Sequence, residues 1–109
     1  MKDGIYCYTL EMTAPLGLRR GKLRLVVQGR LVSGELTMFT RTLPILEGHC
    51  EANRLSFSGD MKTLMETIPY AADGTVTGSR IDLLFTTCKG SYPAVGQQEI
   101  TGQRREAAT

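Results

Sequence analysis

The stretch Arg54-Leu55-Ser56-Phe57-Ser58-Gly59-Asp60-Met61 decides the fold class of this chain. Its apolar residues and its glycine occupy every second position, and serine or aspartate stands between them. Successive side chains of a β-strand point to opposite faces, so this alternation predicts a strand with one buried face. Residues 22–28 alternate in the same way, except that Val26 is apolar at a polar position.

A second signal is repetition, in which an apolar residue precedes a proline and a glycine follows a few positions later. The three copies are Leu43-Pro44-Ile45 with Gly48, Ile68-Pro69-Tyr70 with Gly74, and Tyr92-Pro93-Ala94 with Gly96. Repetition of this kind indicates one supersecondary unit used several times. Glycines inside strands indicate bulges or sharp bends, as at the corners of a barrel.

Turn-forming residues separate eight strand-like segments along the chain. We expect strands at residues 4–13, 21–28, 31–39, 43–51, 54–61, 66–77, 80–88 and 92–98. Eight antiparallel strands with short links favour an all-β, up-and-down β-barrel, because closure removes exposed sheet edges. An open β-sandwich is the alternative. Residues 1–98 then form a single domain, and the polar residues 99–109 are expected to be a flexible tail.

Charge and composition exclude several classes of function. The 109 residues include 13 Lys and Arg against 11 Asp and Glu, a net charge of +2. This balance argues against a nucleic-acid groove or a basic membrane-binding patch. The chain has no apolar run near the roughly 20 residues of a membrane helix, and its first residues do not resemble a secretion signal.

Cysteine usage predicts a reducing, cytoplasmic environment. The three cysteines, Cys7, Cys50 and Cys88, are odd in number and widely spaced. A small secreted domain more often has an even set. We therefore expect buried or half-buried thiols that behave as small hydrophobic groups, with no intramolecular disulfide and no metal site.

The residues do not indicate an enzyme or a cofactor site. The single histidine, His49, precedes Cys50 in an expected strand, so the two side chains point to opposite faces. Ser33, Ser56 and Ser58 lack the glycines that surround a nucleophilic serine in hydrolases. Without a nucleophile, a base and an oxyanion site together, we predict a non-enzymatic protein.

The interior of the expected barrel is the first candidate site. Eight strands enclose a space that side chains just fill, or that holds one small ligand. Gly34 and Gly59 have no side chain, which favours unfilled space inside the barrel. The alternative is an interior that side chains fill completely. We expect a small apolar ligand inside the barrel, with tyrosine hydroxyls as its polar anchors. The inward residues expected to contact it are Tyr6, Tyr8, Met38, Phe57, Met61, Tyr70 and Phe85. Further inward residues are Leu10, Leu25, Leu36, Leu55 and Leu83.

The outer surface is the second candidate site. Val26 and Leu84 are apolar at outward positions, and the first, second, seventh and eighth strands are neighbours in a closed barrel. We expect one apolar patch, which binds a protein partner or a second copy of the chain. Its residues are Ile5, Cys7, Val26, Leu84 and Val95.

Four motifs of the chain resemble those of small uncharacterised bacterial calycin-like (lipocalin-like) barrel proteins. They are Asp3-Gly4-Ile5-Tyr6-Cys7-Tyr8, Thr13-Ala14-Pro15-Leu16-Gly17, Leu31-Val32-Ser33-Gly34 and Leu55-Ser56-Phe57-Ser58-Gly59. The resemblance covers residues 3–98 and implies ligand binding inside the barrel. The opening is distantly similar to GrlR, a lipocalin-like negative regulator of type III secretion that binds a transcription activator. The acidic E-D-E-D motif of GrlR is absent here, so its regulatory role does not carry over.

Overall fold

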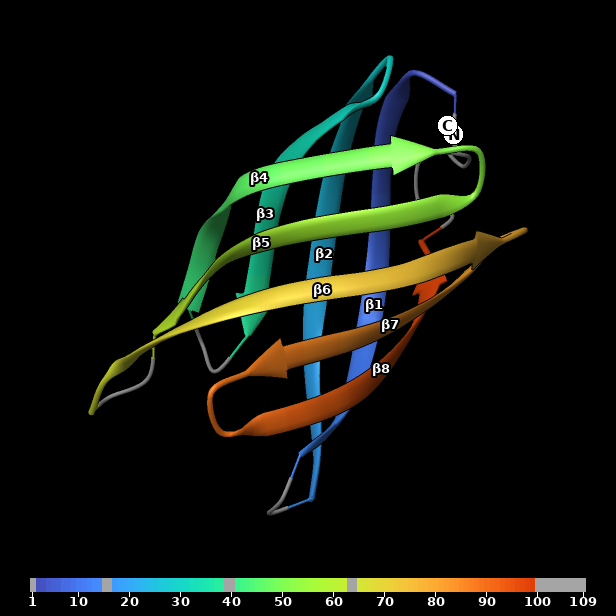
Figure 1. The fold of residues 1–109 in the computed structure, drawn as a ribbon. Helices are drawn as coiled ribbons and strands as arrows, with labels where there is room; N and C mark the ends of the chain where they lie inside the picture. Colours follow the sequence, from blue (N-terminus) through green and yellow to red (C-terminus); the bar gives the residue numbers. More distant parts are fainter. Residues whose placement is uncertain (1, 15–16, 39–40, 63–64, 100–109) are drawn as a thin grey trace.

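Residues 2–14, 17–38, 41–62 and 65–99 are described by the structure, a computed structural model. The strands are β1 (Gly4–Ala14), β2 (Gly17–Gln28), β3 (Leu31–Met38), β4 (Arg41–Glu51), β5 (Arg54–Lys62), β6 (Thr67–Thr77), β7 (Arg80–Thr87) and β8 (Gly90–Gln98). Each strand pairs antiparallel with the next, and β8 pairs with β1, so the sheet closes (Figure 1). This confirms the eight-stranded barrel and excludes the open sandwich.

The largest difference from the expected strand limits is at the start of β2. The strand begins at Gly17 instead of residue 21, because the β1–β2 ladder continues from Glu11 opposite Arg20 to Ala14 opposite Gly17. Residues 17–20 are all exposed. The β2 side of this part of the ladder buries no residue, so no alternation in the sequence of residues 17–20 marks it.

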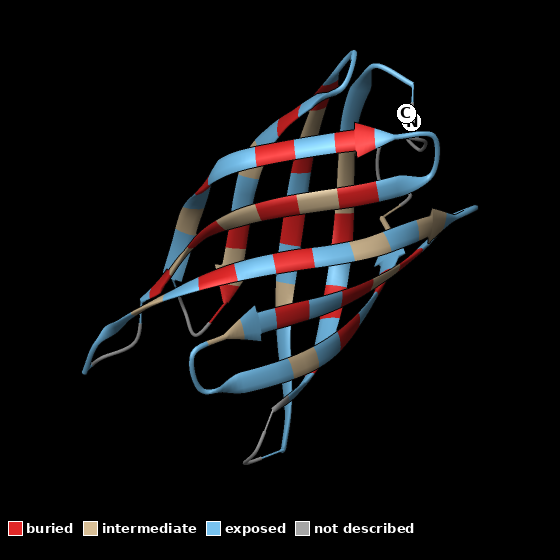
Figure 2. Cartoon of the chain, in the orientation of Figure 1, coloured by how far each residue is buried: buried red, intermediate tan, exposed pale blue. Residues whose placement is uncertain are grey.

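The core consists of the inward side chains of all eight strands. Buried and exposed residues alternate along each strand, as the bands in Figure 2 show. Of the twelve residues expected to point inward, eleven are buried and Tyr6 is half-buried. The alternation in the sequence therefore identified the buried face of the sheet correctly.

The glycines of the proline repeat mark places where neighbouring strands approach closely. A Cβ atom on Gly74 would lie 1.8 Å from the carbonyl oxygen of Asp82, and one on Gly48 would lie 2.6 Å from the carbonyl oxygen of Val32. The register between β3 and β4 shifts over a stretch of β4 that contains Gly48, whereas the register at Gly74 and Gly96 is regular. Between β4 and β5 the shift lies between Ile45 and Glu47, next to the exposed Leu46. The glycines thus allow the sheet to bend tightly.

Backbone hydrogen bonds also tie the barrel together beyond the strand ladders. The amide of Val76 donates to the carbonyl of Asn53, and the amide of Glu99 donates to the carbonyl of Cys7 (2.8 Å each). Glu99 is therefore attached to β1, although we placed it in the tail. The rest of that expected tail, residues 100–109, lies outside the described residues.

The three cysteines are free. Cys50 is buried on β4 and Cys7 is half-buried on β1, as expected. Cys88 is exposed, which corrects our expectation of a buried or half-buried thiol. It follows the last residue of β7, where the chain turns into β8 and the alternation of buried positions ends. Within the described residues there is no helix long and apolar enough to cross a membrane.

Candidate functional site

Three aromatic rings form the centre of the barrel interior. The ring of Tyr70 lies 5.4 Å from that of Phe85 and 6.1 Å from that of Phe57, measured between centroids. Phe57 and Phe85 are 6.0 Å apart in an edge-to-face arrangement. These separations are those of favourable aromatic pairs. The structure therefore brings together three of the seven residues expected to contact a ligand.

Two buried tyrosine hydroxyls have no hydrogen-bond partner among the described residues. The residues are Tyr8, which is completely buried, and Tyr70, which is 4% exposed. Burial raises the pKa of both hydroxyls, that of Tyr70 to about 12, with smaller contributions from Tyr6 and Asp60 respectively. The hydroxyl of Tyr6, by contrast, donates to the carbonyl of Lys2 at 2.6 Å. A buried hydroxyl left unpaired costs about 1–3 kcal/mol.

Buried methionines line one end of the interior. Met12, Met38 and Met61 stand near the ends of β1, β3 and β5, where these strands connect to β2, β4 and β6. Consecutive connections alternate between the two ends of an up-and-down barrel, so these three lie at the same end. Methionine is flexible and fills irregular spaces, so this end of the core is the more adaptable one.

The glycines expected to leave space inside the barrel do not do so. A Cβ atom on Gly34 would lie 1.9 Å from the carbonyl oxygen of Arg24, and one on Gly59 would lie 3.0 Å from the hydroxyl of Tyr70. The completely buried Tyr8 and Phe85 leave no room for water beside them. A ligand in this region must therefore displace side chains.

The outward apolar residues do not form the single patch expected from the sequence. Ile5 lies opposite the half-buried Val26, whereas Val95 lies opposite Glu11, six residues further along β1. Six strand residues span about 20 Å. Leu84 lies opposite Pro93, two residues from Val95 on β8. The structure thus divides the expected patch into two groups, one at Ile5 and one at Leu84.

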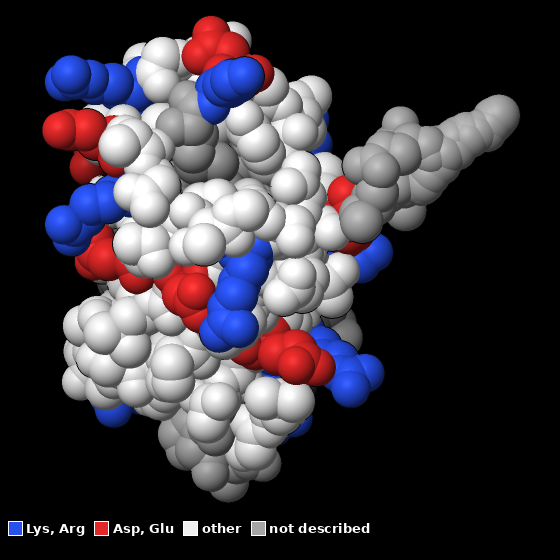
Figure 3. Space-filling model, turned by 90° about the vertical axis from the view of Figure 1, so that its right-hand side faces the viewer, with Lys and Arg blue, Asp and Glu red and all other residues white. Residues whose placement is uncertain are grey.

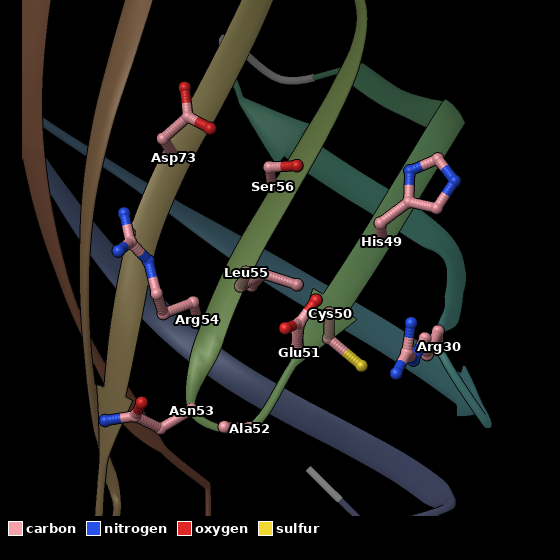
Figure 4. A pocket seen from close by; sticks show the side chains of 11 residues that line it. Arg30, His49, Cys50, Glu51, Ala52, Asn53, Arg54, Leu55, Ser56 and Asp73 are labelled. Carbon is pink, nitrogen blue, oxygen red and sulfur yellow. The ribbon is translucent and has the colours of Figure 1, made fainter.

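A solvent-open hollow of about 660 Å³ lies at the end of the β4–β5 hairpin (Figure 4). On its wall His49 stands opposite Ser56, and Ser56 stands opposite Asp73. This row cannot be found from the sequence, because only the register of β4, β5 and β6 aligns the three residues. In hydrolytic triads the histidine lies between serine and carboxylate. Here the serine is in the middle, so Asp73 does not orient His49.

Charged side chains of both signs surround this hollow, including Arg30, Glu51 and Arg54. No group of three or more potential metal ligands occurs in the part of the chain that the structure describes. The hollow is therefore an open surface depression with charged residues of both signs in its lining.

Comparisons with protein-family models, with curated proteins and with solved structures found no match for this chain.

Proposed function

We propose that this protein is a non-enzymatic, calycin-like barrel that binds a small apolar molecule inside the barrel, with Tyr8 and Tyr70 as its polar anchors. The observation that carries the proposal is the pair of buried hydroxyls without a partner. Folded proteins rarely leave such groups unpaired, so each calls for an explanation. A ligand oxygen that accepts a hydrogen bond from one of them would remove the cost.

The side chains that line the interior determine what kind of ligand can bind there. The surrounding side chains are aromatic and aliphatic, so most of the ligand must be apolar. One or two oxygen atoms suffice to pair with the hydroxyls. The ligand gains room when Met12, Met38 and Met61 change rotamer, which flexible side chains do at low cost.

Two ten-carbon probes, 2-decanone and decane, test the proposal. With methyl-labelled methionine, we expect either probe to shift the NMR signals of Met12, Met38 and Met61. The signal of Met65, which is 90% exposed, should stay unchanged as an internal control. Tyr70→Phe should weaken 2-decanone binding about 2- to 10-fold, because one hydrogen bond contributes about 0.5–1.5 kcal/mol, and should leave decane binding unchanged.

Two results would overturn this function. One is that neither probe shifts the three buried methyl signals at its solubility limit. The other is a crystal structure of the purified protein in which ordered water alone pairs with both hydroxyls. Native mass spectrometry of the same protein would identify a ligand that co-purifies.

A stability measurement tests the unpaired hydroxyl directly. Tyr70→Phe should raise the free energy of unfolding by about 1–3 kcal/mol, because it removes a polar group that is buried without a partner. Tyr6→Phe should lower it by about 1 kcal/mol, because the Tyr6 hydroxyl donates to Lys2. Urea unfolding of each variant, after removal of any bound apolar molecule, measures both changes in the free energy of unfolding. A loss of stability in Tyr70→Phe would mean that its hydroxyl is paired.

A second candidate function is the binding of a protein partner through the outer surface, as in a GrlR-like regulator. The exposed apolar residues of β7 and β8 favour it. For either function we propose the cytoplasm as the compartment, because three free thiols, one of them exposed, suit a reducing environment.

A further inference from the structure

Uncharged side chains cover one continuous area of the outer surface. The area spans the neighbouring strands β7, β8, β1 and β2, and we call it the β8 face. Its residues are Thr13, Leu18, Leu84, Thr86, Ser91, Pro93 and Val95. Three of these side chains are large, apolar and well exposed: Leu18 (54%), Leu84 (45%) and Val95 (37%).

Strand register brings these residues together. Leu84 lies opposite Pro93, Thr86 opposite Ser91, and Thr13 opposite Leu18. Met12 of β1 pairs with Ala94 of β8. Because the two strands are antiparallel, the next residue of β1, Thr13, lies beside Pro93. The sequence separates Leu18 from Leu84 by more than sixty residues, yet closure of the barrel places them on one surface.

A band of charges of both signs borders the β8 face. Arg20 pairs with Glu11 at 3.3 Å, and Arg80 pairs with Asp82 at 2.9 Å. In Figure 3, charged side chains cross the middle of the molecule, and a largely uncharged area lies below them. Val95 stands within this band, between Asp82 and Glu11.

This arrangement is complementary to itself. In a twofold pair of identical chains, the β8 face of one copy covers the β8 face of the other. The band of each copy then offers both cations and anions to the other copy, so opposite charges are available across the contact. A border of a single sign would instead repel a second copy.

The closed barrel also restricts how two copies associate. Each strand has a paired neighbour on both sides, so the sheet has no edge strand to which a second copy could add a strand. Association must therefore use side chains on an outer face. We propose that this chain forms a twofold homodimer through the β8 face, with Leu18, Leu84 and Val95 as its large apolar contacts.

The test measures the dimer dissociation constant of the full chain by sedimentation equilibrium. Unmodified protein should show a reversible monomer–dimer equilibrium. Leu84→Lys should raise the dissociation constant about 100-fold, because the lysine ammonium group would lose its hydration when the interface covers it. Asp73 lies opposite Leu84 on β6, so the new lysine has a neighbouring carboxylate in the monomer and should not prevent folding.

Leu46→Lys is the matched control. Leu46 is 64% exposed at the bulge of β4 and also has an adjacent carboxylate, that of Glu47. This variant should dimerise like the unmodified protein. A second measurement needs no variant: on dilution, amide NMR signals should shift in β7, β8, β1 and β2 only.

Three outcomes would overturn the homodimer. The unmodified protein is monomeric at every concentration up to the millimolar range. Alternatively, Leu46→Lys weakens the dimer as much as Leu84→Lys does. Finally, the signals that shift on dilution lie outside the β8 face. None of these results bears on ligand binding inside the barrel, so the two proposals stand or fall separately.

Discussion

Phe85→Ala is expected to lower the free energy of unfolding by about 3–5 kcal/mol, the range for deletion of a buried aromatic ring. Phe85 is completely buried and contacts the rings of Phe57 and Tyr70. The substitution removes both aromatic contacts and leaves a cavity that the paired strands of a closed barrel cannot easily collapse to fill. Because a small domain has only about 5–15 kcal/mol of stability in total, the variant should be close to unfolding at 37 °C.

Thr86→Ala provides the control for this prediction. Thr86 is the next residue of β7 but is exposed on the outer surface, so its substitution should change stability by less than about 0.5 kcal/mol. Urea unfolding followed by circular dichroism compares the two variants. Equal effects at positions 85 and 86 would contradict the assignment of inner and outer faces in β7.

Gly34→Ala is expected to destabilise the barrel by about 3 kcal/mol or more, from two separate causes. The backbone of Gly34 has a φ of +136°, where side chains are strained. In addition, its new Cβ atom would lie 1.9 Å from the carbonyl oxygen of Arg24. That oxygen belongs to the backbone of β2, so only a displacement of the strand relieves the clash.

Gly17→Ala separates these two causes. Gly17 also has a positive φ, of +118°, but among the described residues other than its chain neighbours no heavy atom lies within 4 Å of the position of its Cβ. This variant should therefore show the conformational strain alone, about 1–3 kcal/mol. Thermal unfolding of both variants measures the difference. If Gly17→Ala and Gly34→Ala lose the same stability, the close approach of β2 and β3 adds nothing to the destabilisation of Gly34→Ala.

Local pattern was enough to predict the strands and their inward faces. The alternation in Leu55-Ser56-Phe57-Ser58 follows from the geometry of a strand, in which neighbouring side chains point to opposite sides. The same pattern failed at residues 17–20, which are all exposed although they pair with β1. It also did not locate the register shift of β4 at Leu46, because Leu46 is an ordinary apolar residue in the sequence.

The candidate sites depended on information that a local pattern does not contain. The sequence indicated that Tyr8 and Tyr70 point inward, but not that their hydroxyls lack a partner, because that depends on which atoms face them from other strands. The row of His49, Ser56 and Asp73 likewise arises from the pairing of three strands.

The number of strands, their approximate limits and their buried faces were predictable because they follow from residues adjacent along the chain. The close packing at Gly34, and the grouping of Leu18 with Leu84 and Val95 but not with Ile5, became visible in the folded barrel alone. The physical reason is register. A change in the register between two strands alters every cross-strand neighbour, yet the sequence of each strand stays the same.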